Sequence, residues 1–187
     1  MPTEQINGLP AHILLVHAVV VLLPLAALAL VLSVLWPAAR RRLGIVTPLL
    51  ALVGLVLVPI TTEAGEWLEG RLGGGSPLIE RHAHLGDQLL PFAVAMFVVA
   101  AAHWAWSFRL NRAAKQARVT STPVEGGGGG VAVAERTATT TVAGTTTGSK
   151  VVAAVFAVLG VASAALTVWM VVRIGDSGAQ AVWTNSF

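Results

Sequence analysis

Long apolar runs alternate with short polar segments along this chain. Four runs contain no Asp, Glu, Lys or Arg, and they cover residues 13–35, 43–60, 89–108 and 151–172. Each run is close to the ~20 residues that an α-helix needs to cross the hydrocarbon core of a bilayer. Membrane β-barrels show short strands of alternating polarity instead. The pattern therefore predicts an all-α fold, an integral membrane four-helix bundle.

The polar segment 61–87, between the second and third runs, also has helical character. It continues without a turn signal to three glycines at 73–75. Ser76 and Pro77 then suit the N-cap and the first residue of the next helix. We expect helices two and three to extend outside the membrane as a helical hairpin that bends at the glycines.

Composition divides the chain into four parts. From 119 to 149 it is dominated by Thr, Ala, Val and Gly, a stretch that cannot bury enough apolar surface to fold. We predict a three-helix membrane core with its hairpin at 7–110, a disordered cytoplasmic linker at 111–149, a fourth transmembrane helix at 150–174 and an extracytoplasmic tail at 175–187.

Charge is scarce and unevenly placed. Hydrophobic residues make up 55% of the chain and charged residues 11%, unlike a soluble domain. Nine of the twelve Lys and Arg residues fall on one predicted side, against Arg71, Arg81 and Arg173 on the other. The positive-inside rule then predicts a multi-pass protein of the cytoplasmic (inner) membrane with both termini extracytoplasmic. No positive residue precedes the first run, which argues against a cleavable signal peptide.

The same features limit the partners and the chemistry. The lipid bilayer is the expected partner, and the basic rim of the protein would attract its anionic headgroups. A nucleic-acid role has no support beyond charge. The chain has no cysteine, which excludes disulfides, thiolate metal sites and cysteine nucleophiles. No nucleophile–base pair or catalytic motif is evident, so an enzyme is not predicted. The chain could also form a homo-oligomer, and the sequence does not decide this.

The histidines are the candidates for cofactor binding. A bis-histidine b-type haem needs two imidazoles from different helices at one depth. His17 and His84 are expected at about the same depth in the membrane, when residues are counted from the ends of their apolar runs. His12 and His82 form an alternative pair that lies farther out, and the sequence does not distinguish which pair would bind haem.

Two other interpretations use the same segment. A divalent metal with hard ligands would combine a histidine with carboxylates, for example Glu63, Glu66, His84 and Asp87. Alternatively, these polar groups only stabilise the hairpin, and the chain is a non-catalytic structural or assembly subunit. Translocation of a proton or substrate is a third possible function. Many transporters are built from internal repeats, and none is evident in this sequence.

Three motifs resemble a known family. LPAHILLVHAVVVLLPLAAL opens the first helix, PITTEAGEWLE closes the second and RHAHLGDQLLPFAV opens the third. Together they resemble the bacterial four-helix membrane family called domain of unknown function 2231, over about residues 7–110. Relatives often have a proline after the first histidine and a Phe-Pro pair after the second, whereas here Ile13 and Ala18 follow.

The resemblance implies a role near an electron-transfer chain, because some relatives are joined to a Rieske-type iron–sulfur domain. It implies His17 and His84 as the first haem-ligand candidates, with His12 and His82 next. Our hypothesis from sequence is thus a protein that binds haem b and exchanges electrons with a separate respiratory redox protein.

Overall fold

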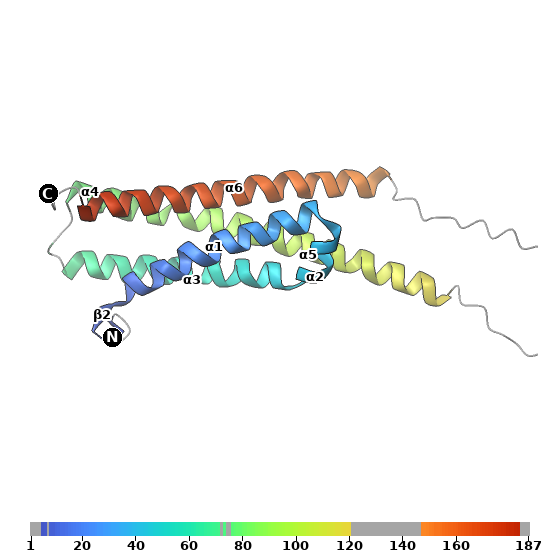
Figure 1. Cartoon of the computed structure of the whole chain (residues 1–187), viewed down its shortest axis with the longest axis horizontal. Coiled ribbons are helices and arrows are strands. Elements are labelled where there is room, and N and C mark those ends of the chain that lie inside the picture. Colours follow the sequence, from blue (N-terminus) through green and yellow to red (C-terminus); the bar gives the residue numbers. More distant parts are fainter. Residues whose placement is uncertain (1–4, 7, 72, 74–75, 121–146, 184–187) are drawn as a thin grey trace, which may run out of the picture.

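The structure, a computed structural model, describes residues 5–6, 8–71, 73, 76–120 and 147–183 (Figure 1). A short antiparallel pair, β1 (Gln5–Ile6) and β2 (Leu9–Pro10), precedes the helices. The helices are α1 (Ala11–Leu35), α2 (Pro37–Leu43), α3 (Val46–Arg71), α4 (Pro77–Asp87), α5 (Leu89–Thr120) and α6 (Thr147–Trp183).

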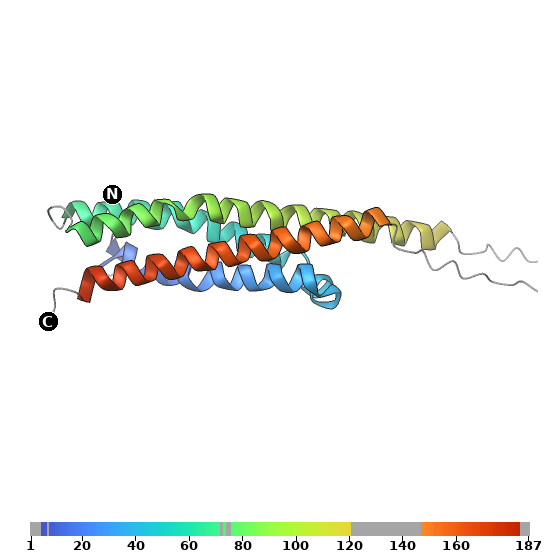
Figure 2. The same cartoon turned by 90° about the horizontal axis from the view of Figure 1, so that it is seen from above.

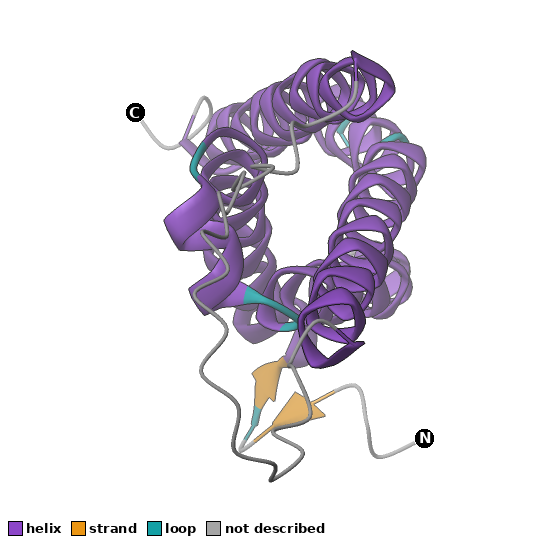
Figure 3. Ribbon diagram, turned by 90° about the vertical axis from the view of Figure 1, so that its right-hand side faces the viewer, coloured by secondary structure: helices purple, strands orange, loops and turns teal. Residues whose placement is uncertain are grey.

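The four long helices form an up-and-down bundle. α1 packs on α3, α3 on α5, α5 on α6 and α6 on α1, so the helices follow one another around the bundle (Figures 2 and 3). The short α2 reverses the chain between α1 and α3, and Gly44 ends it with φ 45°, a conformation that favours glycine. The predicted all-α four-helix fold is confirmed.

The bundle is apolar both inside and outside. Its core includes Leu23, Leu30, Val58, Met96 and Met170, while its outer surface exposes many further large apolar side chains. Such a surface is unsuited to water but matches a lipid environment. Among the described residues, four helical stretches are long and apolar enough to cross a membrane, and the chain is a multi-pass membrane protein. The membrane in question, and the side on which each terminus lies, stay predictions.

The chain reverses between Arg71 and Pro77, where the hairpin is predicted to bend, and Gly73 there has φ 81°. α4 packs chiefly on α6 rather than on the end of α3 (Figure 1). It is followed almost directly by α5, with only Gln88 between them. The second arm of the hairpin is thereby held against the fourth transmembrane helix.

Two helices extend beyond their predicted ends. α5 continues to Thr120, since 109–118 is rich in the good helix formers Arg, Ala, Lys and Gln. α6 continues to Trp183, through most of the predicted tail, and Gln180 donates to Asp176 across one turn at 2.9 Å. The rest of the predicted linker and tail, at 121–146 and 184–187, lies outside the described residues.

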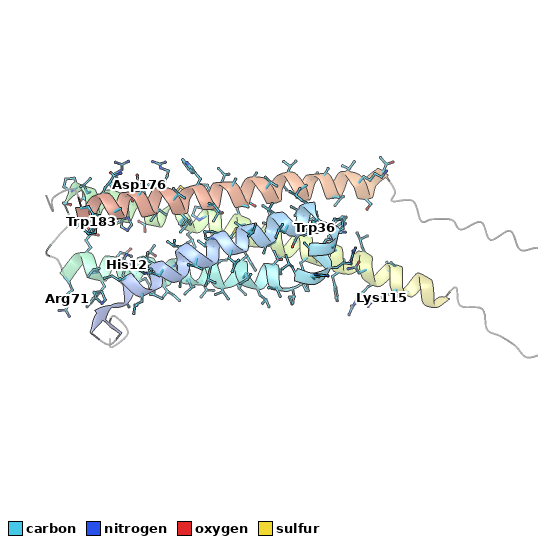
Figure 4. All side chains as sticks on the ribbon, in the orientation of Figure 1. His12, Trp36, Arg71, Lys115, Asp176 and Trp183 are labelled. Carbon is cyan, nitrogen blue, oxygen red and sulfur yellow. The ribbon has the colours of Figure 1, made fainter. Side chains whose placement is uncertain are left out.

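The two ends of the bundle differ in charge. The end with α4 and the last turns of α3 and α6, here called the histidine end, holds every described acidic residue. The opposite end, with α2 and the last turns of α5, carries a run of cations and is called the basic end. Figure 4 labels His12, Arg71 and Asp176 at the first end and Lys115 at the second. The acidic residues are Glu63, Glu66, Glu69, Glu80, Asp87 and Asp176.

A glycine permits the close contact between α1 and α3. A Cβ added at Gly54 would lie 2.6 Å from Cδ2 of Leu23. Leu23 is 0% exposed, so the end of its side chain would have to shift within the packed core to admit the added methyl group.

We predict that Gly54→Ala lowers the free energy of unfolding by about 1–3 kcal/mol through overpacking. Thermal unfolding of the detergent-purified protein, followed by circular dichroism, measures this. Gly70→Ala is the control, because nothing lies within 4 Å of its added Cβ and alanine favours the helix. Equal unfolding temperatures for the two variants would contradict the close packing.

Candidate paired-histidine site

Two histidines from different helices meet at the histidine end. His12 lies in the first turn of α1, and His82 lies at the middle of α4. Their ring centroids are 6.4 Å apart and their planes are inclined at 83°. Both side chains are half-buried. The structure thus brings together the outer of the two predicted pairs.

The His12 ring is held by α3. Its Nδ1 lies 2.9 Å from the main-chain carbonyl oxygen of Thr61. A carbonyl oxygen can only accept, so Nδ1 carries the hydrogen and donates it. In the neutral ring Nε2 then has a free lone pair, and no described residue donates a hydrogen bond to it.

The His82 ring is held in the same way by α6. Its Nδ1 lies 3.2 Å from the carbonyl oxygen of Ile174 and 3.0 Å from Oγ of Ser177. The Ser177 hydroxyl donates its own hydrogen to the Ile174 carbonyl at 2.8 Å, so it accepts from the imidazole. Both contacts therefore require the hydrogen on Nδ1. His82 Nε2, like that of His12, is left as an acceptor.

A glycine stands beside each ring. A Cβ at Gly65 on α3 would lie 3.0 Å from Nδ1 and Cε1 of His12. A Cβ at Gly178 on α6 would lie 3.0 Å from Cε1 of His82. These distances are tighter than ordinary carbon contacts, so any larger residue would displace the rings. The missing side chains make room for the edge of each ring that carries Nδ1 and Cε1; Nε2 would lie 3.8 Å from the added Cβ for His12 and 3.7 Å for His82.

The other predicted pair is not brought together. His17 is exposed, and its Nδ1 lies 2.6 Å from the carbonyl oxygen of Ile13 in its own helix. His84 is also exposed, and its Nδ1 accepts from the Gln88 side-chain amide nitrogen at 3.1 Å. His17 is about 140° around α1 from His12, so it points outward when His12 points inward. Whether either residue binds a ligand stays a prediction.

The carboxylates do not gather around a histidine. Glu63, Glu66, His84 and Asp87 are all exposed. Within the part of the chain that the structure describes, no three His, Cys, Asp or Glu side chains lie where they could hold one metal ion. Exposure keeps these carboxylates hydrated, which explains why no protein ligand sphere forms around them.

Sequence reasoning missed the contribution of α6. This helix carries no histidine, and its last turns were expected to form a tail. Ser177 is nevertheless buried and holds His82. The only signal in the sequence was Ser177 next to Gly178, a small residue and a hydroxyl on one turn of helix.

Comparisons of this chain with protein-family models, with curated proteins and with solved structures give no match. The resemblance of the three motifs to domain of unknown function 2231 therefore stays a prediction.

The hydrogen-bond pattern makes a specific prediction about tautomers. In protein produced without added haem and studied at alkaline pH, His12 and His82 will carry their hydrogen on Nδ1. Free neutral imidazoles of histidine favour Nε2, so this is the less common form. Nitrogen-15 NMR of labelled histidine measures the tautomer directly, with His17→Gln and His84→Gln used to remove the exposed signals. An Nε2–H signal from both remaining end histidines would contradict the geometry.

Proposed function

We propose that this chain binds one b-type haem between His12 and His82 and serves in electron transfer. The observation that carries the proposal is the pair itself. The two imidazoles come from different helices, both are anchored through Nδ1 and both leave Nε2 free to bind a metal. The absence of cysteine from the chain means that a haem would be held without thioether links.

The number of protein ligands favours haem over a bare metal ion. A structural or catalytic zinc site uses three or four protein ligands. The described residues offer two histidines here and no third metal-binding side chain beside them. Two axial imidazoles suffice for haem, because the macrocycle provides the other nitrogen ligands.

The spacing of the rings fits this ligand set. A metal–imidazole bond of about 2 Å, with the ring centroid about 1.1 Å behind the nitrogen, puts the centroids of two axial ligands roughly 6 Å apart. The observed separation is 6.4 Å. If the two imidazoles only packed on each other, their Nδ1 atoms would not need to be bonded to separate helices. In this structure each Nδ1 is bonded to a different helix, α3 or α6.

The chain's own residues would tune the site. When bound, haem supplies a one-electron iron couple. The Thr61 carbonyl accepts from His12, and the Ile174 carbonyl and Ser177 hydroxyl accept from His82. Such hydrogen bonds fix the orientation of each ring and raise the basicity of its other nitrogen. Gly65 and Gly178 allow both rings to keep this orientation.

A structural role is the second candidate, because the same contacts join four helices. His12 connects α1 with α3, His82 connects α4 with α6, and the two ring centroids lie 6.4 Å apart. A chain with this role alone would lose stability when either histidine is removed but would bind no haem.

A reduced-minus-oxidised absorption spectrum of detergent-purified protein, produced with ample haem supply, tests the proposal. We expect sharp b-type bands at close to one haem per chain. His12→Ala and His82→Ala should each lose most of the haem, since an axial ligand is removed. His17→Ala and His84→Ala are matched controls on the same helices and should keep it. A colourless protein, or equal loss in all four variants, contradicts the proposal.

The glycines provide a second matched set within this experiment. Gly65→Ala and Gly178→Ala should lower haem retention, because the added methyl group displaces the ligand rings. Gly70→Ala and Gly175→Ala lie on the same two helices with nothing within 4 Å of the added Cβ, and they should retain haem. Loss of stability in the first pair with full haem binding would favour the structural role.

A further inference from the structure

A cleft opens at the basic end, far along the bundle from the paired histidines. Its volume is about 660 Å³, within the usual range for small-ligand sites. Residues of α1, α2, α5 and the start of α3 line it. Nothing in the proposed haem site uses this cleft, and the inference drawn from it is independent of that site.

Four cations line the cleft. Arg40 and Arg41 come from α2, and Arg112 and Lys115 come from the end of α5. The described carboxylates all lie at the histidine end, so none of them neutralises this cluster. The guanidinium carbon of Arg112 lies 4.4 Å from the centroid of the Phe108 ring, which holds that charge beside the cleft. Among the described residues the cluster therefore has no carboxylate partner, and its positive charge can attract an anion.

One residue of the cleft lining, Ser107, has a buried hydroxyl without a partner among the described residues. Ser107 is 7% exposed, and its Oγ makes no hydrogen bond to any residue that the structure describes. The other buried hydroxyls of the lining, Ser33 and Thr47, bond to each other at 3.0 Å. A buried hydroxyl without a partner is costly, and a bound acceptor would remove that cost.

Two aromatic residues, together with the buried His103, form another part of the wall. Trp104 and Phe108 stack with ring centroids 5.6 Å apart and an angle of 23° between their planes. Trp at the end of a membrane-spanning helix is typical of the boundary between hydrocarbon and headgroups. The cleft thus joins an apolar, lipid-facing wall to a set of hydrogen-bond donors that carry positive charge.

We propose that this cleft binds the phosphate of an anionic phospholipid. Arg40, Arg112 and Lys115 would donate charged hydrogen bonds to the phosphate oxygens, and Ser107 would donate its hydroxyl to the same group. The acyl chains would leave the cleft along the apolar outer surface of the bundle. Basic pockets between transmembrane helices commonly select anionic headgroups for these reasons.

Native mass spectrometry of the full chain in detergent tests the proposal. The probes are dioleoyl phosphatidylglycerol, dioleoyl phosphatidylcholine and inorganic phosphate. We expect one phosphatidylglycerol to bind at least about tenfold more tightly than phosphatidylcholine, and phosphate alone to bind weakly. Equal binding of the two lipids overturns the proposal. Tight binding of inorganic phosphate that displaces the lipid overturns the lipid as the source of the phosphate.

Substitutions distinguish a built site from general attraction. Arg40→Gln and Arg112→Gln should each weaken phosphatidylglycerol binding about fivefold. Arg42→Gln and Arg109→Gln are the controls, because these exposed cations lie at the same end but do not line the cleft. An equal effect of all four would mean that charge alone attracts the lipid, contrary to the proposal.

Ser107→Ala provides a readout that a structural role would not give. It removes a donor to the bound phosphate, so lipid affinity should fall about tenfold. It also removes an unsatisfied buried hydroxyl, so the lipid-free protein should unfold at the same temperature or higher. Loss of stability with unchanged lipid affinity would overturn the role of Ser107 and with it the proposed site.

Discussion

Three hydrogen bonds at the histidine end orient the two rings on which the proposed function depends. The Thr61 carbonyl on α3 accepts from His12, and the Ile174 carbonyl and Ser177 hydroxyl on α6 accept from His82. Because each bond uses Nδ1, each ring presents Nε2 with a free lone pair. The rotation of α1, the docking of α4 on α6 and the two glycines all serve to hold these bonds in place. Without these hydrogen bonds, nothing in the described part of the chain would fix the orientation of the two imidazole rings at this end of the bundle.

The two ends of the bundle have opposite chemistry, and the apolar middle separates them. Every described acidic residue is at the histidine end, whereas the cations of α2 and of the last turns of α5 are at the basic end. Charges cannot be placed in the hydrocarbon without large cost, so the polar functions of the chain are confined to its two surfaces. The haem site proposed for this chain therefore lies at one surface, and the proposed site for an anionic lipid lies at the other.

The sequence was sufficient for the fold because the four apolar runs have the length of a bilayer and the polar breaks between them are clear. It was insufficient for the rotation of the helices. α1 is apolar on all sides, so no polar face indicates which side turns inward. His12 and His17 lie about 140° apart on this helix, and only packing against α3 and α6 decides between them.

Contacts between residues far apart in the chain were also beyond sequence reasoning. Ser177 holds His82 across 95 positions, and the Thr61 main-chain carbonyl has no side-chain signature at all. The prediction of the fourth helix stopped at residue 174, so the turn that carries Ser177 and Gly178 was assigned to a tail. Likewise, nothing in the sequence distinguished the unpartnered hydroxyl of Ser107 from that of Ser33, which Thr47 satisfies.

Electron paramagnetic resonance of the oxidised, haem-loaded protein tests the central claim most directly. The planes of His12 and His82 are inclined at 83°. Axial imidazoles that are nearly perpendicular give low-spin ferric haem a highly anisotropic signal with a large g maximum, whereas parallel rings give a rhombic signal. We expect the anisotropic low-spin signal from the intact protein, and His12→Ala and His82→Ala should abolish it. A high-spin signal, a rhombic one or protein that takes up no haem would contradict the assignment of these two histidines as paired ligands.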